Sequence, residues 1–167
     1  MAVKDNINTY RLPTTAASDI LRGFQPSQDA TVTSLLERAG LLLMAKTNMD
    51  EFGMGSHSIN SAFGPVTNGR RDALSVGGSS GGSAVAVAQN LAEYGIGTDT
   101  GGSVRLPAAY MSVVGFKPSY GFISRNGVIP YANSLDTVGI IARDVLDIRL
   151  MFGTSSLSLQ TPLLRLT

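Results

Sequence analysis

Cysteine is absent from the 167 residues. Its absence excludes disulfide bonds, a thiolate nucleophile and zinc sites built from cysteine. Histidine occurs once, at position 57, which is a thin basis for a histidine-dependent catalytic triad. Apolar runs such as 40–45 fall far short of the ~20 residues that a transmembrane helix needs. We therefore expect no membrane partner, and any nucleophile must be an oxygen or a nitrogen.

An excess of charge of either sign is also absent, because 13 basic and 12 acidic residues give a formal net charge of +1. This balance indicates neither a nucleic-acid groove nor a membrane-binding patch. Charged and polar residues begin at Lys4, with no apolar or arginine-rich leader before them. We therefore expect no signal or transit peptide in the chain.

Hydrophobic residues make up 43% of the sequence, which is enough to form one globular core. Residue patterns predict helices over 29–40, capped by Asp29, over 82–90, from about 103 to 113, and over 145–152. They predict strands over 41–45, 94–97 and 113–116. This alternation predicts an α/β fold with a largely buried sheet. Residues 1–153 form the expected domain, and 154–167, which lack a clear period, are predicted to be a poorly ordered tail.

Two loops place serine hydroxyls among glycines: 77–83 (Gly-Gly-Ser-Ser-Gly-Gly-Ser) and 101–103 (Gly-Gly-Ser). Such a loop before a helix can present backbone N–H groups to a phosphate or to the oxyanion of acyl transfer. A flexible linker fits poorly, since the first loop runs directly into an alanine and valine helix. A phosphate loop also fits poorly, since neither loop ends in Lys-Ser or Lys-Thr. A serine nucleophile is the favoured interpretation.

A serine nucleophile needs a base, and the sequence offers His57 or one of the lysines 4, 46 and 117. A lone histidine in a loop is usually only exposed. Lysine can act if burial lowers its pKa from ~10.4 to ~7–8, which disfavours the charge by roughly 4 kcal/mol. The spacing of the lysines does not choose among them.

The serine loops lie within longer motifs that resemble the amidase signature family. These motifs are Lys-Asp-Asn at 4–6, Lys-Thr-Asn-Met-Asp-Glu-Phe at 46–52, Gly-Gly-Ser-Ser-Gly-Gly-Ser-Ala at 77–84, Gly-Thr-Asp-Thr-Gly-Gly-Ser-Val-Arg at 97–105, Gly-Phe-Lys-Pro at 115–118 and Ser-Leu-Asp-Thr-Val-Gly at 134–139. Within the family, residues 49–56 and 63–68 resemble the A subunits of glutamyl-tRNA(Gln) amidotransferases, more the mitochondrial than the bacterial form. The resemblance implies an amidase-signature core with a mixed, largely buried sheet flanked by helices, incomplete at both ends.

The resemblance also implies which residues are catalytic. It implies that Ser103 is the nucleophile, that Ser79, preceded by a cis peptide bond, is the bridging serine, and that Lys4 is the base. Lys46 and Lys117 are then structural, with packed stems and solvated or paired heads. Asp99 and Arg105 are expected to brace the nucleophile loop. The implied oxyanion hole consists of the backbone N–H groups of Thr100, Gly101, Gly102 and Ser103, and no metal is expected.

The activity implied by the resemblance is hydrolysis of the glutamine amide, which supplies ammonia for converting Glu-tRNA(Gln) to Gln-tRNA(Gln). Glutamine and the other amidotransferase subunits are the expected partners, and tRNA is reached only through the complex. No cofactor is expected in this subunit, whereas ATP and Mg would be used by a partner subunit. The expected location is the mitochondrion, with the cytoplasm as the alternative. A free-standing amidase for other amides and an inactive truncated remnant are the alternative functions.

Overall fold

The computed structural model describes residues 1–69, 71 and 73–155. At its centre lies a mixed five-stranded sheet of order β2-β1-β3-β5-β4. β1 is parallel to β2 and β3, whereas β5 is antiparallel to β3 and β4. The expected mixed α/β sheet is thus confirmed. The strands are β1 (Ala2–Lys4), β2 (Ala45–Thr47), β3 (Gly95–Asp99), β4 (Val114–Phe116) and β5 (Thr137–Ala142).

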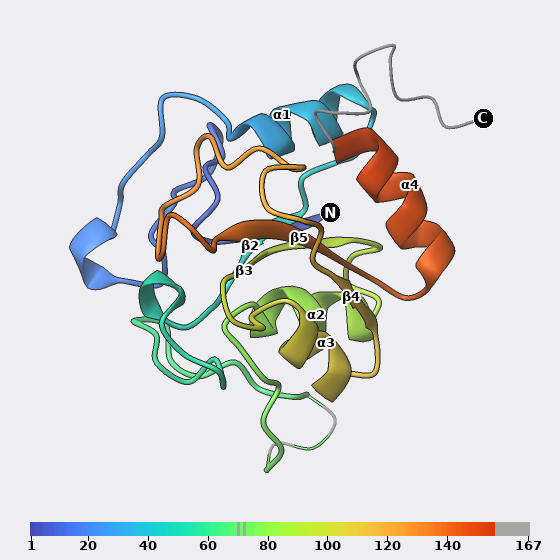
Figure 1. Cartoon of the computed structure of the whole chain (residues 1–167). Helices are drawn as coiled ribbons and strands as arrows, with labels where there is room; N and C mark the ends of the chain where they lie inside the picture. Colours follow the sequence, from blue (N-terminus) through green and yellow to red (C-terminus); the bar gives the residue numbers. More distant parts are fainter. Residues whose placement is uncertain (70, 72, 156–167) are drawn as a thin grey trace.

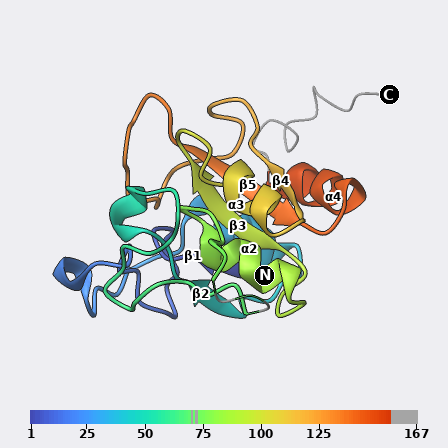
Figure 2. The ribbon, with the colours of Figure 1, turned by 90° about the horizontal axis from the view of Figure 1, so that it is seen from below.

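Helices cover both faces of this sheet (Figure 1). α1 (Thr31–Arg38) and α4 (Val145–Ser155) pack together on one face. α2 (Gly81–Ala88) and α3 (Arg105–Tyr110) pack together on the other, and Figure 2 views the molecule from their side. Two short 3-10 helices, η1 (Asp19–Leu21) and η2 (Glu51–Gly53), lie in the connections.

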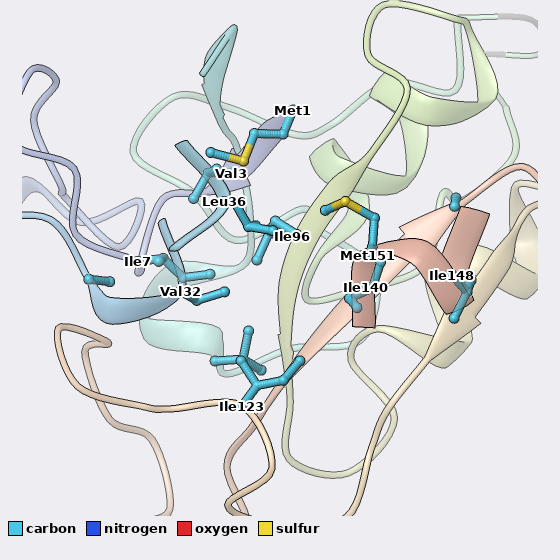
Figure 3. Packing of buried hydrophobic residues seen from close by; sticks show 13 residues of the cluster. Met1, Val3, Ile7, Val32, Leu36, Ile96, Ile123, Ile140, Ile148 and Met151 are labelled. Atoms are coloured by element: carbon cyan, nitrogen blue, oxygen red, sulfur yellow. The ribbon is translucent and has the colours of Figure 1, made fainter. Parts of the chain in front are cut away.

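Strand β5 contributes side chains to the cores on both sides of the sheet. Val138, Ile140 and Ala142 belong to the core beneath α1 and α4, whereas Ile141 packs with residues of α2 and α3. This alternation follows from the two-residue period of a strand. Both faces are therefore apolar, as expected for a buried sheet. Figure 3 shows the first core, whose labelled members are Met1, Val3, Ile7, Val32, Leu36, Ile96, Ile123, Ile140, Ile148 and Met151.

The four predicted helices are confirmed with shifted ends, but the strand predicted over 41–45 is wrong. Strand β2 begins only at Ala45, because its register with β1 starts at the pair Ala2 and Ala45. Leu42 and Met44 are 75% and 63% exposed, whereas Leu41 and Leu43 pack against the core, so the run is only half-buried. Asp29 does not cap α1 either, since its carboxylate accepts the N–H of Tyr10.

The end of α4 changes the boundary of the predicted tail. The helix continues through Thr154 and Ser155, which were expected to belong to the tail. The remainder of that tail, 156–167, lies outside the described residues.

The carboxyl ends of β1 and β3 meet at one edge of the sheet, because the two strands are parallel neighbours. Lys4 ends β1, and Asp99 ends β3. The loop that carries Ser79 leads into α2, which packs on these same two strands. The fold therefore gathers the predicted catalytic motifs at this edge.

Candidate active site

Lys4 lies at the centre of the candidate site and is fully buried. Its Nζ lies 2.7 Å from Ser79 Oγ. The same nitrogen donates to Thr98 Oγ1 at 2.9 Å and to the Thr98 carbonyl oxygen at 3.2 Å. A neutral amine has two N–H groups and one lone pair. Thr98 can therefore take both N–H groups, which leaves the lone pair for the hydroxyl proton of Ser79.

Burial lowers the pKa of Lys4 to about 7, and the charges of Asp50, Asp99 and Asp136 act in the opposite direction. Desolvation disfavours the ammonium form, whereas nearby carboxylates favour it. The resulting value lies in the range that a lysine base requires near neutral pH. The structure thus supplies the burial that a lysine base was expected to need.

Ser79 is 1% exposed and follows a cis peptide bond, Gly78–Ser79, as the resemblance implied. Its neighbour Ser80 is also buried and donates its hydroxyl to the Thr98 carbonyl oxygen at 3.2 Å. The chain then enters α2, an apolar helix buried against β1 and β3. The serine loop is therefore anchored to the strands that carry Lys4 and Thr98.

Asp99 shapes the loop that carries Ser103. Its carboxylate accepts the N–H groups of Gly102 at 2.9 Å and Val104 at 3.0 Å. The Arg105 guanidinium binds both carboxylate oxygens, at 2.9 and 3.1 Å. Burial raises the pKa of Asp99, but Arg105 and the backbone N–H groups outweigh it and hold that pKa below its usual value. Asp99 and Arg105 thus brace the loop, as expected.

Open space lies beside the two glycines of the loop that carries Ser103. Gly102 has φ +130°, which a residue with a side chain rarely adopts. A Cβ at Gly101 or Gly102 would meet no protein atom within 4 Å, so the space beside both is open. Ser103 is half-buried at the end of this loop. Space for a ligand therefore adjoins the predicted nucleophile.

One of the four predicted oxyanion donors is already engaged. The N–H of Gly102 donates to Asp99, so it does not point freely into the site. Among the described residues, no acceptor contacts the N–H groups of Thr100, Gly101 and Ser103. These three N–H groups are therefore free to bind an oxyanion, and the oxyanion hole stays a prediction.

A small cavity adjoins Ser79, the predicted bridging serine. Asn6 donates through Nδ2 to Thr98 Oγ1 at 3.1 Å, while its buried Oδ1 has no partner. Asp136 accepts the Thr100 hydroxyl at 2.6 Å. Sequence reasoning assigned no role to Asn6 or Asp136, although both lie inside the family motifs. The cavity is lined by Asn6, Gly53, Ser79, Thr98, Thr100, Val128, Ile129, Tyr131 and Asp136.

The other candidate bases lie outside this cluster. His57 is exposed, and its Nδ1 lies 3.1 Å from Ser75 Oγ. Lys46 pairs with Asp5 at 3.0 Å, and Lys117 donates to the carbonyl oxygen of Pro118 at 2.7 Å. Lys46 and Lys117 thus have the paired heads expected of structural lysines.

Metal sites and membrane-spanning helices are both missing from the described part of the chain. Residues 1–69, 71 and 73–155 contain no group of three or more His, Asp or Glu side chains arranged to hold a metal ion. None of the helices in those same ranges has the length and hydropathy needed to span a bilayer.

Known proteins are similar to this chain in sequence. A relative from Ajellomyces capsulatus is 57% identical over 157 residues, covering 92% of this chain and 30% of the relative. One from Emericella nidulans is 60% identical over 158 residues, covering 89% and 31%. Both are described as mitochondrial A subunits of glutamyl-tRNA(Gln) amidotransferases. The chain thus spans about a third of the length of these relatives.

Solved structures are also similar to this chain. The glutamyl-tRNA(Gln) amidotransferase A subunit of Thermotoga maritima matches with a TM-score of 0.91 and 45% identity, over 93% of this chain and 34% of that one. A peptide amidase from Stenotrophomonas maltophilia matches with a TM-score of 0.88 and 44% identity, over 93% and 33%. The amidase family model matches residues 1–159. The chain therefore belongs to the amidase family.

Proposed function

We propose that the protein containing this chain hydrolyses the side-chain amide of glutamine and supplies the ammonia to a glutamyl-tRNA(Gln) amidotransferase. The observation that carries this proposal is the 2.7 Å contact between Ser79 Oγ and a fully buried Lys4 whose pKa is about 7. A neutral amine at this position can take a proton from a serine hydroxyl near neutral pH. The names of these relatives, A subunits of glutamyl-tRNA(Gln) amidotransferases, support the transfer reaction and the multi-subunit complex.

In the proposed reaction, Ser103 Oγ attacks the amide carbon of glutamine, and its proton passes through Ser79 to Lys4. The N–H groups of Thr100, Gly101 and Ser103, which have no acceptor among the described residues, would stabilise the oxyanion. Collapse of the intermediate breaks the C–N bond, and the proton held by Lys4 returns through Ser79 to the leaving nitrogen. Ammonia departs, and a glutamyl ester on Ser103 remains. Water then hydrolyses this ester to glutamate and restores Ser103.

The ammonia would pass to other subunits that amidate Glu-tRNA(Gln). ATP and Mg would be used there rather than by the residues of this chain. The mitochondrial relatives support a mitochondrial location, with the cytoplasm as the alternative. A free-standing amidase is the second candidate, since the peptide amidase matches the fold with nearly the same identity as the amidotransferase subunit.

The test compares amides in the full-length protein, with and without its partner subunits. Ammonia release is measured from glutamine, asparagine and a peptide amide, with Ser103→Ala as the blank. We expect Ser103-dependent release that favours glutamine, and transfer to Glu-tRNA(Gln) only with partners, ATP and Mg. Equal or better turnover of the peptide amide without partners would support the free-standing amidase. Absence of any Ser103-dependent release would reject the proposed function.

A further inference from the structure

Asp50 is a buried carboxylate that the proposed reaction does not use. It is fully buried, and no ion pair involves it in the described part of the chain. Its oxygens accept the N–H groups of Ser58 at 2.8 Å, Ile59 at 3.1 Å and Asn60 at 3.3 Å. Although Asp50 precedes η2, it makes no capping hydrogen bond to that helix. The carboxylate therefore fixes the backbone of residues 58–60.

Ser58 connects this fixed backbone to the bridging serine. Its hydroxyl accepts the N–H of Gly81 at 3.0 Å and donates to the carbonyl oxygen of Ser79 at 3.4 Å. The side chain is fully buried, and the residue has φ +55°. A single hydroxyl thus holds the backbone on both sides of Ser80.

The same loop also packs tightly against Gly78. A Cβ at Gly78 would lie 2.4 Å from Asp50 Oδ2 and 2.8 Å from the Ser58 nitrogen. Not even a methyl group fits between the two segments there. Movement of the 58–60 backbone would therefore be transmitted directly to the Gly78–Ser79 peptide.

We propose that Asp50 and Ser58 are positioning residues that hold Ser79 Oγ against Lys4. Asp50 fixes the Ser58 backbone, and the Ser58 hydroxyl fixes residues 79–81. This inference rests on the proposed function, in which Ser79 carries the proton to Lys4. Displacement of a reacting group by about 1 Å can lower a rate ~10²-fold, so the position of Ser79 controls the rate.

The charge of Asp50 has a second effect on the same pair. The charges of three carboxylates, Asp50, Asp99 and Asp136, each raise the pKa of Lys4 against the effect of burial. Asp99 is compensated by Arg105, whereas Asp50 is bound only by backbone N–H groups. Neutralising Asp50 should therefore lower the pKa of Lys4 further.

The experiment compares Ser58→Ala and Asp50→Asn with Ser56→Ala, an exposed serine of the same loop, in the full-length protein. Each variant is measured for kcat and KM per titrated active site, for Tm, and for the pH dependence of kcat/KM. We expect Ser58→Ala to lower kcat ~10- to 100-fold with KM nearly unchanged, and Ser56→Ala to match the wild type. We expect Asp50→Asn to move the acidic limb of the pH profile to lower pH.

Expressing kcat per titrated active site distinguishes a displaced Ser79 from a smaller amount of folded protein. A structural role alone would lower Tm but leave kcat per site and the acidic limb unchanged, and that result would overturn the inference. Ser58→Ala removes only one oxygen atom, so it tests the positioning of Ser79 even if Asp50→Asn does not fold. If the wild type itself shows no Ser103-dependent turnover, the proposed function fails instead.

Discussion

The backbone N–H of Ser80 donates a hydrogen bond to the carbonyl oxygen of Ser103 at 3.0 Å. This bond joins the two glycine and serine loops directly, just before the chain enters α2 and α3. Asp99 holds the second loop from the other side through the N–H groups of Gly102 and Val104. Ser79 and Ser103 are therefore carried by one connected unit, and a change in either loop should affect both.

Replacing the nucleophile tests the proposed reaction most directly. Ser103→Ala should lower amide hydrolysis at least ~10³-fold and abolish the acyl-enzyme. Gly101 and Gly102 carry no side chain, and the Thr100 hydroxyl is donated to Asp136, so no neighbour can replace Ser103. Ammonia release and mass spectrometry of trapped acyl-enzyme measure the effect. Ser119→Ala, at an exposed serine, is the control. Near-normal turnover by Ser103→Ala would reject Ser103 as the nucleophile.

The pKa of Lys4 predicts the pH dependence of the rate. The base must be neutral, so kcat/KM should rise with pH and level off above an apparent pKa of about 7. Burial of Lys4 lowers this pKa, and the carboxylates of Asp50, Asp99 and Asp136 raise it. Steady-state kinetics on glutamine between about pH 5 and pH 9 measure the limb. A midpoint close to about pH 4, typical of a free carboxylate, would argue against the lysine base.

The same pKa predicts an effect on stability. Lys4 loses its proton at about pH 7 when folded and near 10.5 when unfolded, so between these values the unfolded chain binds more protons. The contribution of Lys4 to the free energy of unfolding should therefore rise with pH across that window, by about 5 kcal/mol at most. Below about pH 7 the full cost of the buried charge applies, and above pH 10.5 this cost is gone.

Lys4→Met removes this titration and the activity together. The difference in the free energy of unfolding between wild type and Lys4→Met should change with pH between about 7 and 10.5, in favour of wild type as pH rises. Denaturant titrations of both proteins at several pH values measure it. A difference that is constant across the window would show that Lys4 keeps its ordinary pKa.

Sequence reasoning reached what is local or contained in a motif. The helix over 82–90 was predicted from its small apolar residues and is confirmed with shifted ends. The catalytic roles of Lys4, Ser79 and Ser103 come from the motifs that contain them and stay predictions. Strand β5 was missed because its run, 137–142, is short and mostly apolar, and its pairing with β3 depends on residues about 40 positions away. The three-dimensional contact between Lys4 and Ser79 spans 75 residues, so spacing alone could not choose among the lysines.

The contribution of Asp50 could not be predicted for a related reason. Its carboxylate binds the N–H groups of residues 58–60, and these bonds appear only when the loop is folded back. The family motif drew attention to residues 46–52 as a block without separating Asp50 from its neighbours. The hydrogen bond from the Gly102 N–H to Asp99 could not be predicted either, because it forms only when the loop folds around the Asp99 carboxylate.

Arg105 provides a test of the brace on the nucleophile loop. Arg105→Lys cannot bind both oxygens of Asp99, so the loop should loosen and kcat should fall ~10-fold, with a larger fall for Arg105→Ala. The exposed ion pair of Arg22 and Asp19 offers the matched control, since Arg22→Ala removes a surface pair worth little. Kinetics and Tm are measured together. Unchanged kcat in Arg105→Ala would show that the backbone N–H groups on Asp99 suffice to hold the loop.

The lone histidine separates the lysine mechanism from a histidine triad. His57→Ala should keep most of the catalytic rate, because the His57 side chain is exposed and its ring contacts the hydroxyl of Ser75. No carboxylate orients the ring within the described residues, as a catalytic histidine requires. The backbone nitrogen of His57 lies close to Gly78 in the serine loop, and Ala keeps that backbone. The measurement is kcat for glutamine in His57→Ala, with Tm and circular dichroism to confirm the fold. A loss of ~10³-fold or more in a folded variant would favour a histidine base, because losses of that size are expected when a general base is removed.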